Sequence, residues 1–475
     1  MKYLFWICFI FCSILIILPF LFCDFWMDEI ISIWDYISLP HFKDVFMHYS
    51  EANNHIYFSA LLWLWRSLFD VRTSEFLMRI PCLIFWCFLL ISCIYYGKIY
   101  FPNWWRLLLL IFAFSPICLS FAFQLRGYSW SLFLGILFTF GVLDIIHNHY
   151  IHGCIVSGLS CFFLIGIIPS NMLLICAGIL FLFIVSLKNH SKNIFYCCLF
   201  LSILFILSFF PYFLNWKDFC RIMNIPTQAL LGKTLLDVLL GLFFHLLILL
   251  LLLCRFHSRS SIGLIMLIVA IIGLFSSLYL SKQVPFSRVY LILFPWVTIA
   301  FLYFIESSQH ENKWSELQWC ILLFCFVGFF LVFDSMTNFI TKKNVENGIL
   351  PQNLSMQFYK KNSNASKFVQ KIIATPQYRK NSFFVASFMP FVAFRHYAVL
   401  AGYNPLYIID ARDTSKLSAL KNRNIHFYIV ASSSQEAQRM ATSIINNSVV
   451  SCELSYGMYQ LYSISFPNSA CLNCQ

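Results

Sequence analysis

Long apolar runs separated by short polar segments are the dominant pattern along this chain. The runs of membrane-spanning length, about 17–25 residues, cover approximately residues 3–23, 79–97, 106–123, 128–146, 151–168, 170–187, 194–214, 236–254, 262–280, 288–305 and 318–336. A helix of about 20 apolar residues crosses the hydrocarbon core of a bilayer. The pattern therefore predicts an α-helical polytopic membrane protein with about 11 transmembrane helices.

One further apolar run, Ile56 to Phe69, is short for a span and is interrupted by Arg66. If this run lies along the membrane, the basic residues between the spans fall on one face, as cytoplasmic loops do. These residues are Lys2, Lys98, Arg106, Lys188, Lys192, Arg255, Arg259 and Lys313. If the run crosses, all but Lys2 move to the other face. We therefore expect a juxtamembrane helix inside a first external loop, about residues 24–78.

The last part of the chain has a different composition, which predicts a separate domain. We expect a transmembrane module over residues 1–337 and a small extracytoplasmic α/β domain over residues 338–475. Runs rich in aromatic and β-branched residues predict strands, and a more polar run predicts a helix. The expected strands are Ser382–Phe388, Tyr397–Leu400, His426–Ala431 and Met458–Ile464, and the expected helix is Ser434–Asn446.

Composition agrees with membrane insertion. The chain is 60% hydrophobic with a mean hydropathy of +0.77, and only 11% of its residues are charged, against about 25% in soluble domains. From Thr341 onward there are 14 Lys and Arg against five Asp and Glu, so most of the net charge of +12 lies there. Such a basic domain suits anionic lipid head groups, although ordinary solvation of a small domain is the simpler explanation.

Two adjacent carboxylates follow the first apolar run. Asp28 and Glu29 are flanked by Trp26, Ile30 and Trp34, so we expect them to be partly desolvated at the membrane surface. Desolvation raises the pKa of a carboxyl group and makes it a suitable proton acceptor. The alternative is an acidic interfacial loop without a chemical role.

Other polar residues are expected near the same membrane face. They are Asn53, Asn54, His55, Arg79, Gln124, Arg126, Tyr128, Lys217, Arg221, Lys233, Lys282 and Arg288. A single arginine at a membrane boundary often only extends its charge into water. Several cations on the face of the acidic loop suit a reaction in which a hydroxyl loses its proton and an anionic phosphate leaves.

In these segments the chain resembles the GT-C glycosyltransferases, in the branch of the protein O-mannosyltransferases and the bacterial aminoarabinose transferase. The family's ordered motifs correspond here to Asp28-Glu29, His55-Ile56-Tyr57, Arg79-Ile80-Pro81-Cys82, Gln124-Leu125-Arg126-Gly127-Tyr128 and Arg288-Val289-Tyr290-Leu291. The resemblance extends to about residue 305. It departs from the family in lacking two prolines after His55 and in carrying Gln124 where glutamate is usual.

The resemblance implies an inverting transfer from a polyprenyl-phosphate-linked sugar to a lipid, glycan or protein acceptor. Asp28 and Glu29 would be catalytic. The donor phosphate would be bound by Arg126, Arg288, Lys282 and Arg79, and the substrate loop would contain His55, Asn54, Tyr57, Tyr128 and Tyr290. The sequence leaves a divalent metal ion open. Membrane lipids are expected partners, and nucleic acid is not.

The expected location is a bacterial inner membrane, with the active site and the C-terminal domain on the periplasmic side. A transporter or flippase of a lipid-linked saccharide is the main alternative. Transporters, however, bind substrate near the bilayer midplane and often contain repeated halves, whereas here the polar residues gather at one membrane edge and no repeat is found. A purely structural membrane protein is a third alternative.

Overall fold

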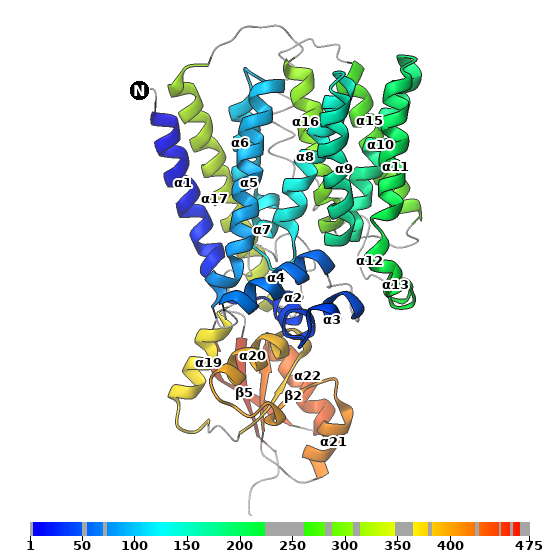
Figure 1. Ribbon diagram of the computed structural model, residues 1–475. Helices are drawn as coiled ribbons and strands as arrows, with labels where there is room; N and C mark the ends of the chain where they lie inside the picture. The colour runs from blue at the N-terminus through cyan, green and yellow to red at the C-terminus, as the bar shows by residue number, and fades with distance from the viewer. Residues whose placement is uncertain are drawn as a thin grey trace, which may run out of the picture. The chain divides into compact units, whose positions relative to one another are not determined.

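The computed structural model describes residues 3–49, 55–69, 74–223, 261–280, 287–306, 314–346, 364–378, 382–422, 427–445, 448–456 and 459–465 (Figure 1). The chain divides into two compact units. One, called here the helix bundle, consists of Met1–Leu21 and Trp34–Asp334. The other, called the C-terminal unit, consists of Phe22–Ile33 and Ser335–Gln475. Each unit is described by itself.

Eight helical segments in the described residues are long and apolar enough to cross a membrane. They are α1 (Leu4–Phe22), α5 (Glu75–Tyr100), α8 (Tyr128–Ile146), α9 (Tyr150–Ile167), η2 with α10 (Pro169–Asn171, Met172–Lys188), α11 with α12 (Lys192–Leu207, Phe210–Phe213), η3 with α16 (Ser287–Ile292, Leu293–Glu306) and the first part of α17 (Glu316–Glu346). The prediction of a polytopic helical membrane protein is confirmed.

Three predicted spans are not among these eight segments. The run 106–123 forms two shorter helices, α6 (Trp105–Phe114) and α7 (Pro116–Ala122). Proline lacks the N–H that a continuous helix needs, and it drives the preceding Ser115 into an extended conformation with ψ 122°. The run 262–280 forms α15 (Ser261–Leu280). The run 236–254 lies outside the described residues.

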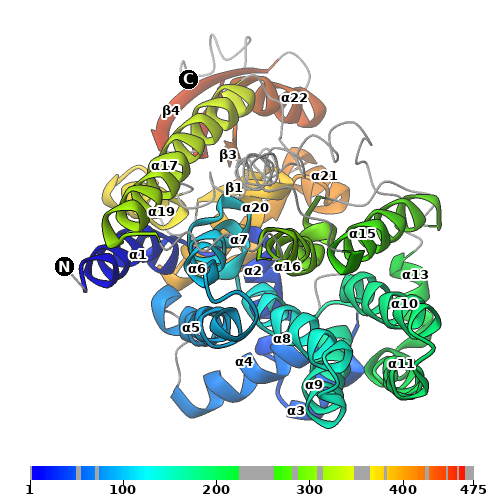
Figure 2. The same cartoon turned by 90° about the horizontal axis from the view of Figure 1, so that it is seen from above.

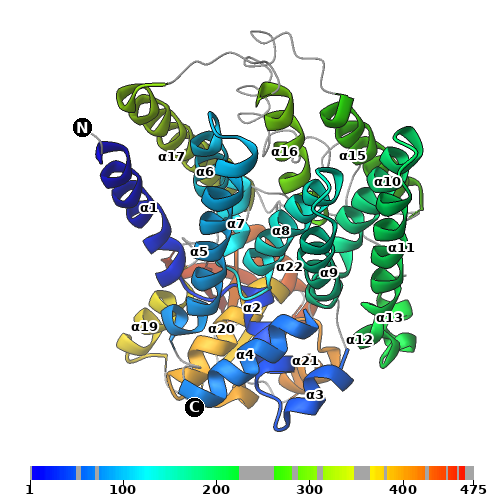
Figure 3. The ribbon, with the colours of Figure 1, turned by 45° about the horizontal axis from the view of Figure 1, so that its top comes forward.

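Two short helices lie across one end of the bundle, transverse to the long helices (Figure 3). They are α3 (Phe42–Met47) and α4 (Ile56–Phe69), and the end where they lie is called here the α4 end. Arg66 in α4 donates a 2.6 Å hydrogen bond from Nη1 to the carbonyl oxygen of Ile37. The α4 helix matches the predicted juxtamembrane helix in its bounds.

Glycine lets α4 approach the long helices closely. A Cβ atom added at Gly166 in α9 would lie 2.1 Å from the ring of Tyr57. Gly127 has φ +69°, and a Cβ there would lie 3.0 Å from the Cβ of Phe58. Since side chains are strained or excluded at both positions, these glycines allow α4 to pack directly on the starts and ends of the long helices.

The centre of the bundle is α8, which packs against α5, α9, α10 and α16 (Figure 2). Its contact with α9 depends on small residues. A Cβ at Gly141 would lie 2.7 Å from the backbone nitrogen of Ser157, and one at Gly153 would lie 2.7 Å from the carbonyl oxygen of Gly141. Close backbone approach at small residues is how helices associate in lipid.

A mixed five-stranded sheet forms the core of the C-terminal unit, in the order β2-β1-β3-β5-β4. The strands are β1 (Phe383–Ala386), β2 (Ile408–Asp410), β3 (Phe427–Ala431), β4 (Val449–Tyr456) and β5 (Tyr459–Ser465). The first three are parallel, and β5 runs antiparallel to both β3 and β4. Three of the predicted strands and the predicted helix, now α22 (Ser434–Ile444), are confirmed.

The prediction of a strand at Tyr397–Leu400 is wrong, because this segment ends α20 (Phe388–Leu400). Phe391, Phe394 and Ala398 recur at helical spacing, and Phe394 packs on Phe384 of β1 with ring centroids 5.2 Å apart. Burial of one helical face overrides the strand preference of Tyr397 and Val399. The other helices are α19 (Ala365–Ala374) and α21 (Thr414–Asn422).

Candidate functional site

The proposed catalytic carboxylates lie in a short helix, α2 (Met27–Ser32), which belongs to the C-terminal unit. Asp28 is 8% exposed and Glu29 is 2% exposed. The backbone N–H of Trp26 donates a 2.8 Å hydrogen bond to Glu29 Oε2, which satisfies a donor at the start of the helix. Glu29 therefore holds the helix start, and this is a structural role beside the catalytic one predicted for it.

The segment before α2 is fixed by residues far along the chain. Asp24 accepts two hydrogen bonds of 2.7 Å from Ser366, one from its backbone N–H and one from its hydroxyl. The backbone N–H of Phe25 donates a 2.7 Å hydrogen bond to the hydroxyl of Tyr397 in α20. A carboxylate at the start of α19 is favourable because it satisfies helix N–H groups and the helix dipole. The acidic segment is thus anchored by two helices of the C-terminal unit.

A buried histidine packs against this anchored segment. His396 in α20 packs edge-on against the ring of Phe25, with centroids 5.9 Å apart. Burial disfavours the charged imidazolium and lowers the pKa of His396 to about 4. The ring is therefore neutral at pH 7.

In the helix bundle, Tyr128 brings together residues from three sequence segments. His55, at the start of α4, lies edge-on to the Tyr128 ring at 5.6 Å. The guanidinium carbon of Arg126 lies 5.7 Å from the centre of the same ring. All three side chains are at least 95% buried. The structure thus brings together three of the residues that the motifs predicted, at the α4 end.

Arg79 and Gln124 are also buried at this end, with 1% and 6% exposure. Arg79 donates a 3.3 Å hydrogen bond from Nη1 to the carbonyl oxygen of Leu21, at the end of α1. Gln124 Nε2 donates a 2.7 Å hydrogen bond to the carbonyl oxygen of Ser120. Because their polar atoms reach backbone carbonyls, both residues hold neighbouring segments of the chain in place.

A small hollow of about 10 Å³ opens beside Tyr128, between α8, η2 and η3. Asn171 lines it and donates hydrogen bonds of 2.9 Å to Ser131 Oγ and 2.8 Å to the carbonyl oxygen of Leu164. Val289 of η3 lines the same hollow. Asn171 and Ser131 were not predicted as site residues from the sequence. The available signal was an amide directly after Pro169-Ser170 between two apolar runs.

For the remaining predicted site residues, the structure describes only some of the surroundings. Tyr290 is buried in η3, and Tyr57 packs on Phe162 and Phe163 of α9, with ring centroids 6.3 and 5.8 Å apart. Arg288 is the second residue of η3, next to Val289, while its side chain lies outside the described part. Asn54 and Lys282 lie outside the described residues.

Another acid of the first loop was not selected from sequence. Asp35 is half-buried in a π-helical turn, η1 (Ile33–Ile37). Burial raises the pKa of Asp35, and the nearby His48 opposes this shift. Asp35 is therefore a carboxyl group of the first loop whose environment favours proton uptake.

In the part of the chain that the structure describes, no group of three or more His, Cys, Asp or Glu side chains could hold a metal ion. The sixteen cysteines described there are all free.

Comparisons with known proteins identify the fold. No protein-family model matches the chain, and no curated protein matches it by sequence. Its structure is similar to the crystal structure of ArnT from Cupriavidus metallidurans in the apo state, with a TM-score of 0.55 and 9% sequence identity. The match covers 96% of this chain and 97% of that chain. ArnT is an aminoarabinose transferase of the GT-C family. This chain therefore has a multi-pass membrane fold of the glycosyltransferase type, and the predicted resemblance is confirmed for the fold.

Proposed function

We propose that this protein is an integral-membrane glycosyltransferase that moves a sugar from a polyprenyl-phosphate donor to a hydroxyl group of a lipid, glycan or protein. The observation that carries the proposal is the extent of the fold match, which includes the spans, the first loop and the C-terminal domain. An Asp-Glu pair directly after the first span is in the position that the resemblance requires.

Asp28 is the proposed base. The acceptor oxygen attacks the anomeric carbon of the sugar while its proton passes to the Asp28 carboxylate. The bond between that carbon and the phosphate oxygen breaks, and polyprenyl phosphate leaves with the bonding electrons. Attack opposite the leaving group inverts the anomeric configuration.

Arg126 and Arg288 are the proposed ligands of the donor phosphate, together with Lys282. Arg126 is buried beside Tyr128, where low polarity strengthens its interaction with a charged phosphate. Val289, adjacent to Arg288, lines the same hollow as Tyr128. Arg79 has a supporting role in this proposal, because it contacts the backbone of Leu21.

The C-terminal unit is proposed to position the base. Asp24 and Phe25 are hydrogen-bonded to Ser366 and Tyr397, and Asp28 follows three residues later. A base must be held within hydrogen-bond reach of the hydroxyl that it deprotonates. In this proposal the C-terminal domain acts on the reaction indirectly, by positioning the base. We place the protein in the bacterial inner membrane, with this chemistry on the periplasmic face.

The test is a transfer assay. Purified protein in detergent receives a panel of polyprenyl-phosphate sugars with an envelope lipid extract as acceptor, and released polyprenyl phosphate is measured by mass spectrometry. The expected result is release with one donor and appearance of an inverted glycoside. If the protein instead moves the intact donor across proteoliposome membranes without breaking the sugar–phosphate bond, it is a flippase and the proposal fails.

A further inference from the structure

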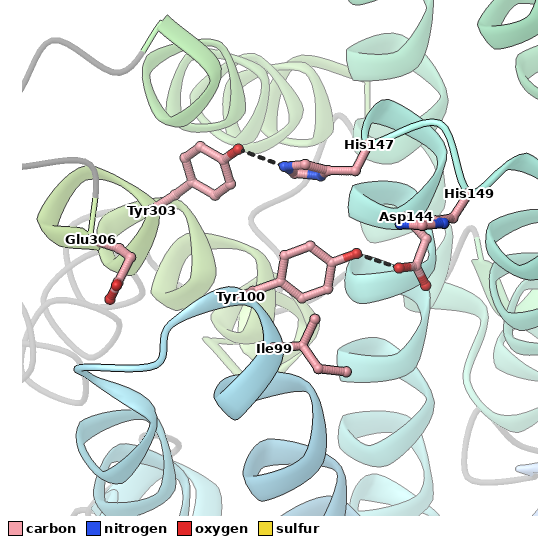
Figure 4. Close-up of a pocket in the computed structure, with 7 residues that line it drawn as sticks. All are labelled: Ile99, Tyr100, Asp144, His147, His149, Tyr303 and Glu306. Atoms are coloured by element: carbon pink, nitrogen blue, oxygen red, sulfur yellow. Dashed lines mark hydrogen bonds between the residues drawn. The ribbon is translucent and has the colours of Figure 1, made fainter.

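A second polar cavity lies at the end of the helix bundle opposite the α4 end, where α5, α8 and α16 finish. It has a volume of about 500 Å³. Its lining residues are Ile99, Tyr100, Asp144, His147, His149, Tyr303 and Glu306 (Figure 4). These residues belong to none of the motifs that the proposed transfer reaction uses.

Hydrogen bonds fix one carboxylate in the wall of this cavity. The hydroxyl of Tyr100, at the end of α5, donates to Asp144 Oδ1. The other oxygen of Asp144 lies 2.8 Å from Nδ1 of His152. Both oxygens of Asp144 are therefore engaged by the protein. Asp144 is also 5% exposed, and its main effect is to orient the Tyr100 ring.

A second pair orients another phenol ring. Nδ1 of His147 lies 2.8 Å from the carbonyl oxygen of Leu143, which can only accept, so this nitrogen carries a hydrogen. Nε2 lies 3.1 Å from the Tyr303 hydroxyl, within hydrogen-bond distance. In Figure 4 the rings of Tyr100 and Tyr303 extend from two different helices toward α8. The His147 ring lies 5.4 Å from Tyr100 and 6.2 Å from Tyr303.

Glu306 completes the lining with a carboxylate that keeps unused hydrogen-bonding capacity. Its Oε1 accepts a 3.1 Å hydrogen bond from Nδ2 of Asn103. Its Oε2 is shielded from solvent and has no hydrogen-bond partner among the residues that the structure describes. A shielded carboxylate oxygen is costly unless a donor or cation meets it.

We propose that this cavity binds an organic ammonium group. Oriented aromatic rings beside a carboxylate attract such a cation through ring quadrupoles and a charge-assisted hydrogen bond. No lysine or arginine appears among the lining residues in the described part of the chain, and the Glu306 carboxylate keeps one oxygen for a cationic partner. The volume is sufficient for an amine-bearing head group or small molecule. This inference is independent of the transfer reaction.

Two sources can supply the ammonium group, and the experiment distinguishes them. One arm measures binding of ethanolamine to the detergent-purified protein by calorimetry. The other compares the thermal midpoint of the protein in nanodiscs of phosphatidylethanolamine and of phosphatidylglycerol. Binding of ethanolamine indicates a soluble amine, and a higher midpoint in phosphatidylethanolamine alone indicates a lipid head group.

Variants decide whether the cavity is responsible. Glu306→Gln and Tyr303→Leu should each weaken ethanolamine binding about tenfold or abolish the lipid preference, whereas Tyr303→Phe, which keeps the ring, should lose less. Asp218→Asn removes an acid of α13 (Trp216–Met223), away from the cavity, and should leave both arms unchanged. The proposal is overturned if neither amine has an effect on the wild-type protein, or if the effects persist in Glu306→Gln and Tyr303→Leu.

Discussion

Asp24 and Ser366, 342 positions apart in the sequence, are joined by two hydrogen bonds of 2.7 Å. One comes from the backbone N–H and one from the hydroxyl of Ser366, so both oxygens of the carboxylate are used. Asp24 is the first acid after α1, and Asp28 follows four residues later, in α2. The domain at the end of the chain thereby holds the start of the proposed catalytic segment.

This connection predicts a coupled loss of stability. Asp24→Ala leaves the N–H of Ser366 without its acceptor, and a hydrogen bond to a charged group contributes about 1.5–3 kcal/mol. We expect Asp24→Ala to lower the free energy of unfolding by about 2 kcal/mol and Ser366→Ala by less, because the backbone bond remains. Thermal unfolding in detergent measures both.

A double-mutant cycle provides the control for this connection. The Asp24→Ala and Ser366→Ala effects should be non-additive by about 1 kcal/mol, whereas Asp44→Ala, in α3, should add to Ser366→Ala. Additive effects of Asp24→Ala and Ser366→Ala would contradict the connection.

His396 predicts a pH dependence of stability. Its pKa is about 4 in the folded protein and about 6.5 in an unfolded chain. Between these values the unfolded state binds a proton that the folded state does not, so the free energy of unfolding falls as pH decreases from about 6.5 to 4. The expected loss is up to about 3 kcal/mol.

His396→Phe keeps a ring of similar shape without the titrating group. Its stability should depend less on pH across this window, by the amount that His396 contributes. His41→Phe, at an exposed position before α3, should retain the wild-type profile. Identical pH profiles for His396→Phe and the wild-type protein would show that another group controls acid sensitivity.

Much of the bundle could be predicted from sequence because lipid imposes one rule on every span. A spanning helix must satisfy its backbone internally and present about 20 apolar residues, and this signal is visible in each run. The break at Ser115-Pro116 was not predicted. Proline is tolerated in many membrane helices, and the local pattern does not show where a helix will separate in two.

The C-terminal unit was predicted less completely. The three-residue strand β2 and the strand β4, whose sequence mixes polar and apolar residues, are too short or too irregular to stand out. The helix α20 was mistaken in part for a strand because Tyr397 and Val399 favour strands in isolation. Its identity depends on packing against β1, which is a tertiary effect.

The candidate site was predicted as residue types but not as contacts. The motifs selected His55, Arg126 and Tyr128, and the structure groups them around one ring. The Asp24–Ser366 connection could not be predicted, because no sequence pattern near Asp24 indicates a contact with a serine at the start of α19.

Arg126 and Arg288 are predicted to determine kcat/KM for the lipid donor. A guanidinium can hold a phosphate through two parallel hydrogen bonds, which lysine cannot reproduce. The leaving phosphate gains charge as its bond breaks, so these contacts strengthen in the transition state. Arg288→Lys and Arg126→Lys should each lower kcat/KM for the lipid donor about tenfold or more, with little change in the KM of the acceptor.

Arg412→Lys is the matched control, because Arg412 pairs with Asp410 in the C-terminal unit. It should leave donor kinetics unchanged. If Arg288→Lys alters only the thermal midpoint, then Arg288 is an interfacial anchor and the donor phosphate binds elsewhere.

The position of α4 predicts the topology of every later loop. If α4 lies along the membrane, Asn53→Cys and Ser74→Cys, on either side of it, should both react with a membrane-impermeant thiol reagent added from outside. Asn189→Cys, between α10 and α11 at the opposite end, should not react. The background must lack other reactive external thiols. Labelling at only one of positions 53 and 74 would mean that the segment crosses the membrane.

The most direct measurement of the central claim is the rate of polyprenyl phosphate release by Asp28→Asn, compared with Glu29→Gln and Asp35→Asn at equal folded protein. Asp28→Asn preserves shape but removes the proton acceptor. We expect a loss of about 100-fold or more for Asp28→Asn, the scale of general-base catalysis. Smaller losses are expected for Glu29→Gln, which weakens the bond to Trp26, and for Asp35→Asn. Near-normal release by Asp28→Asn, or a larger loss in Asp35→Asn, would contradict the assignment of Asp28 as the base.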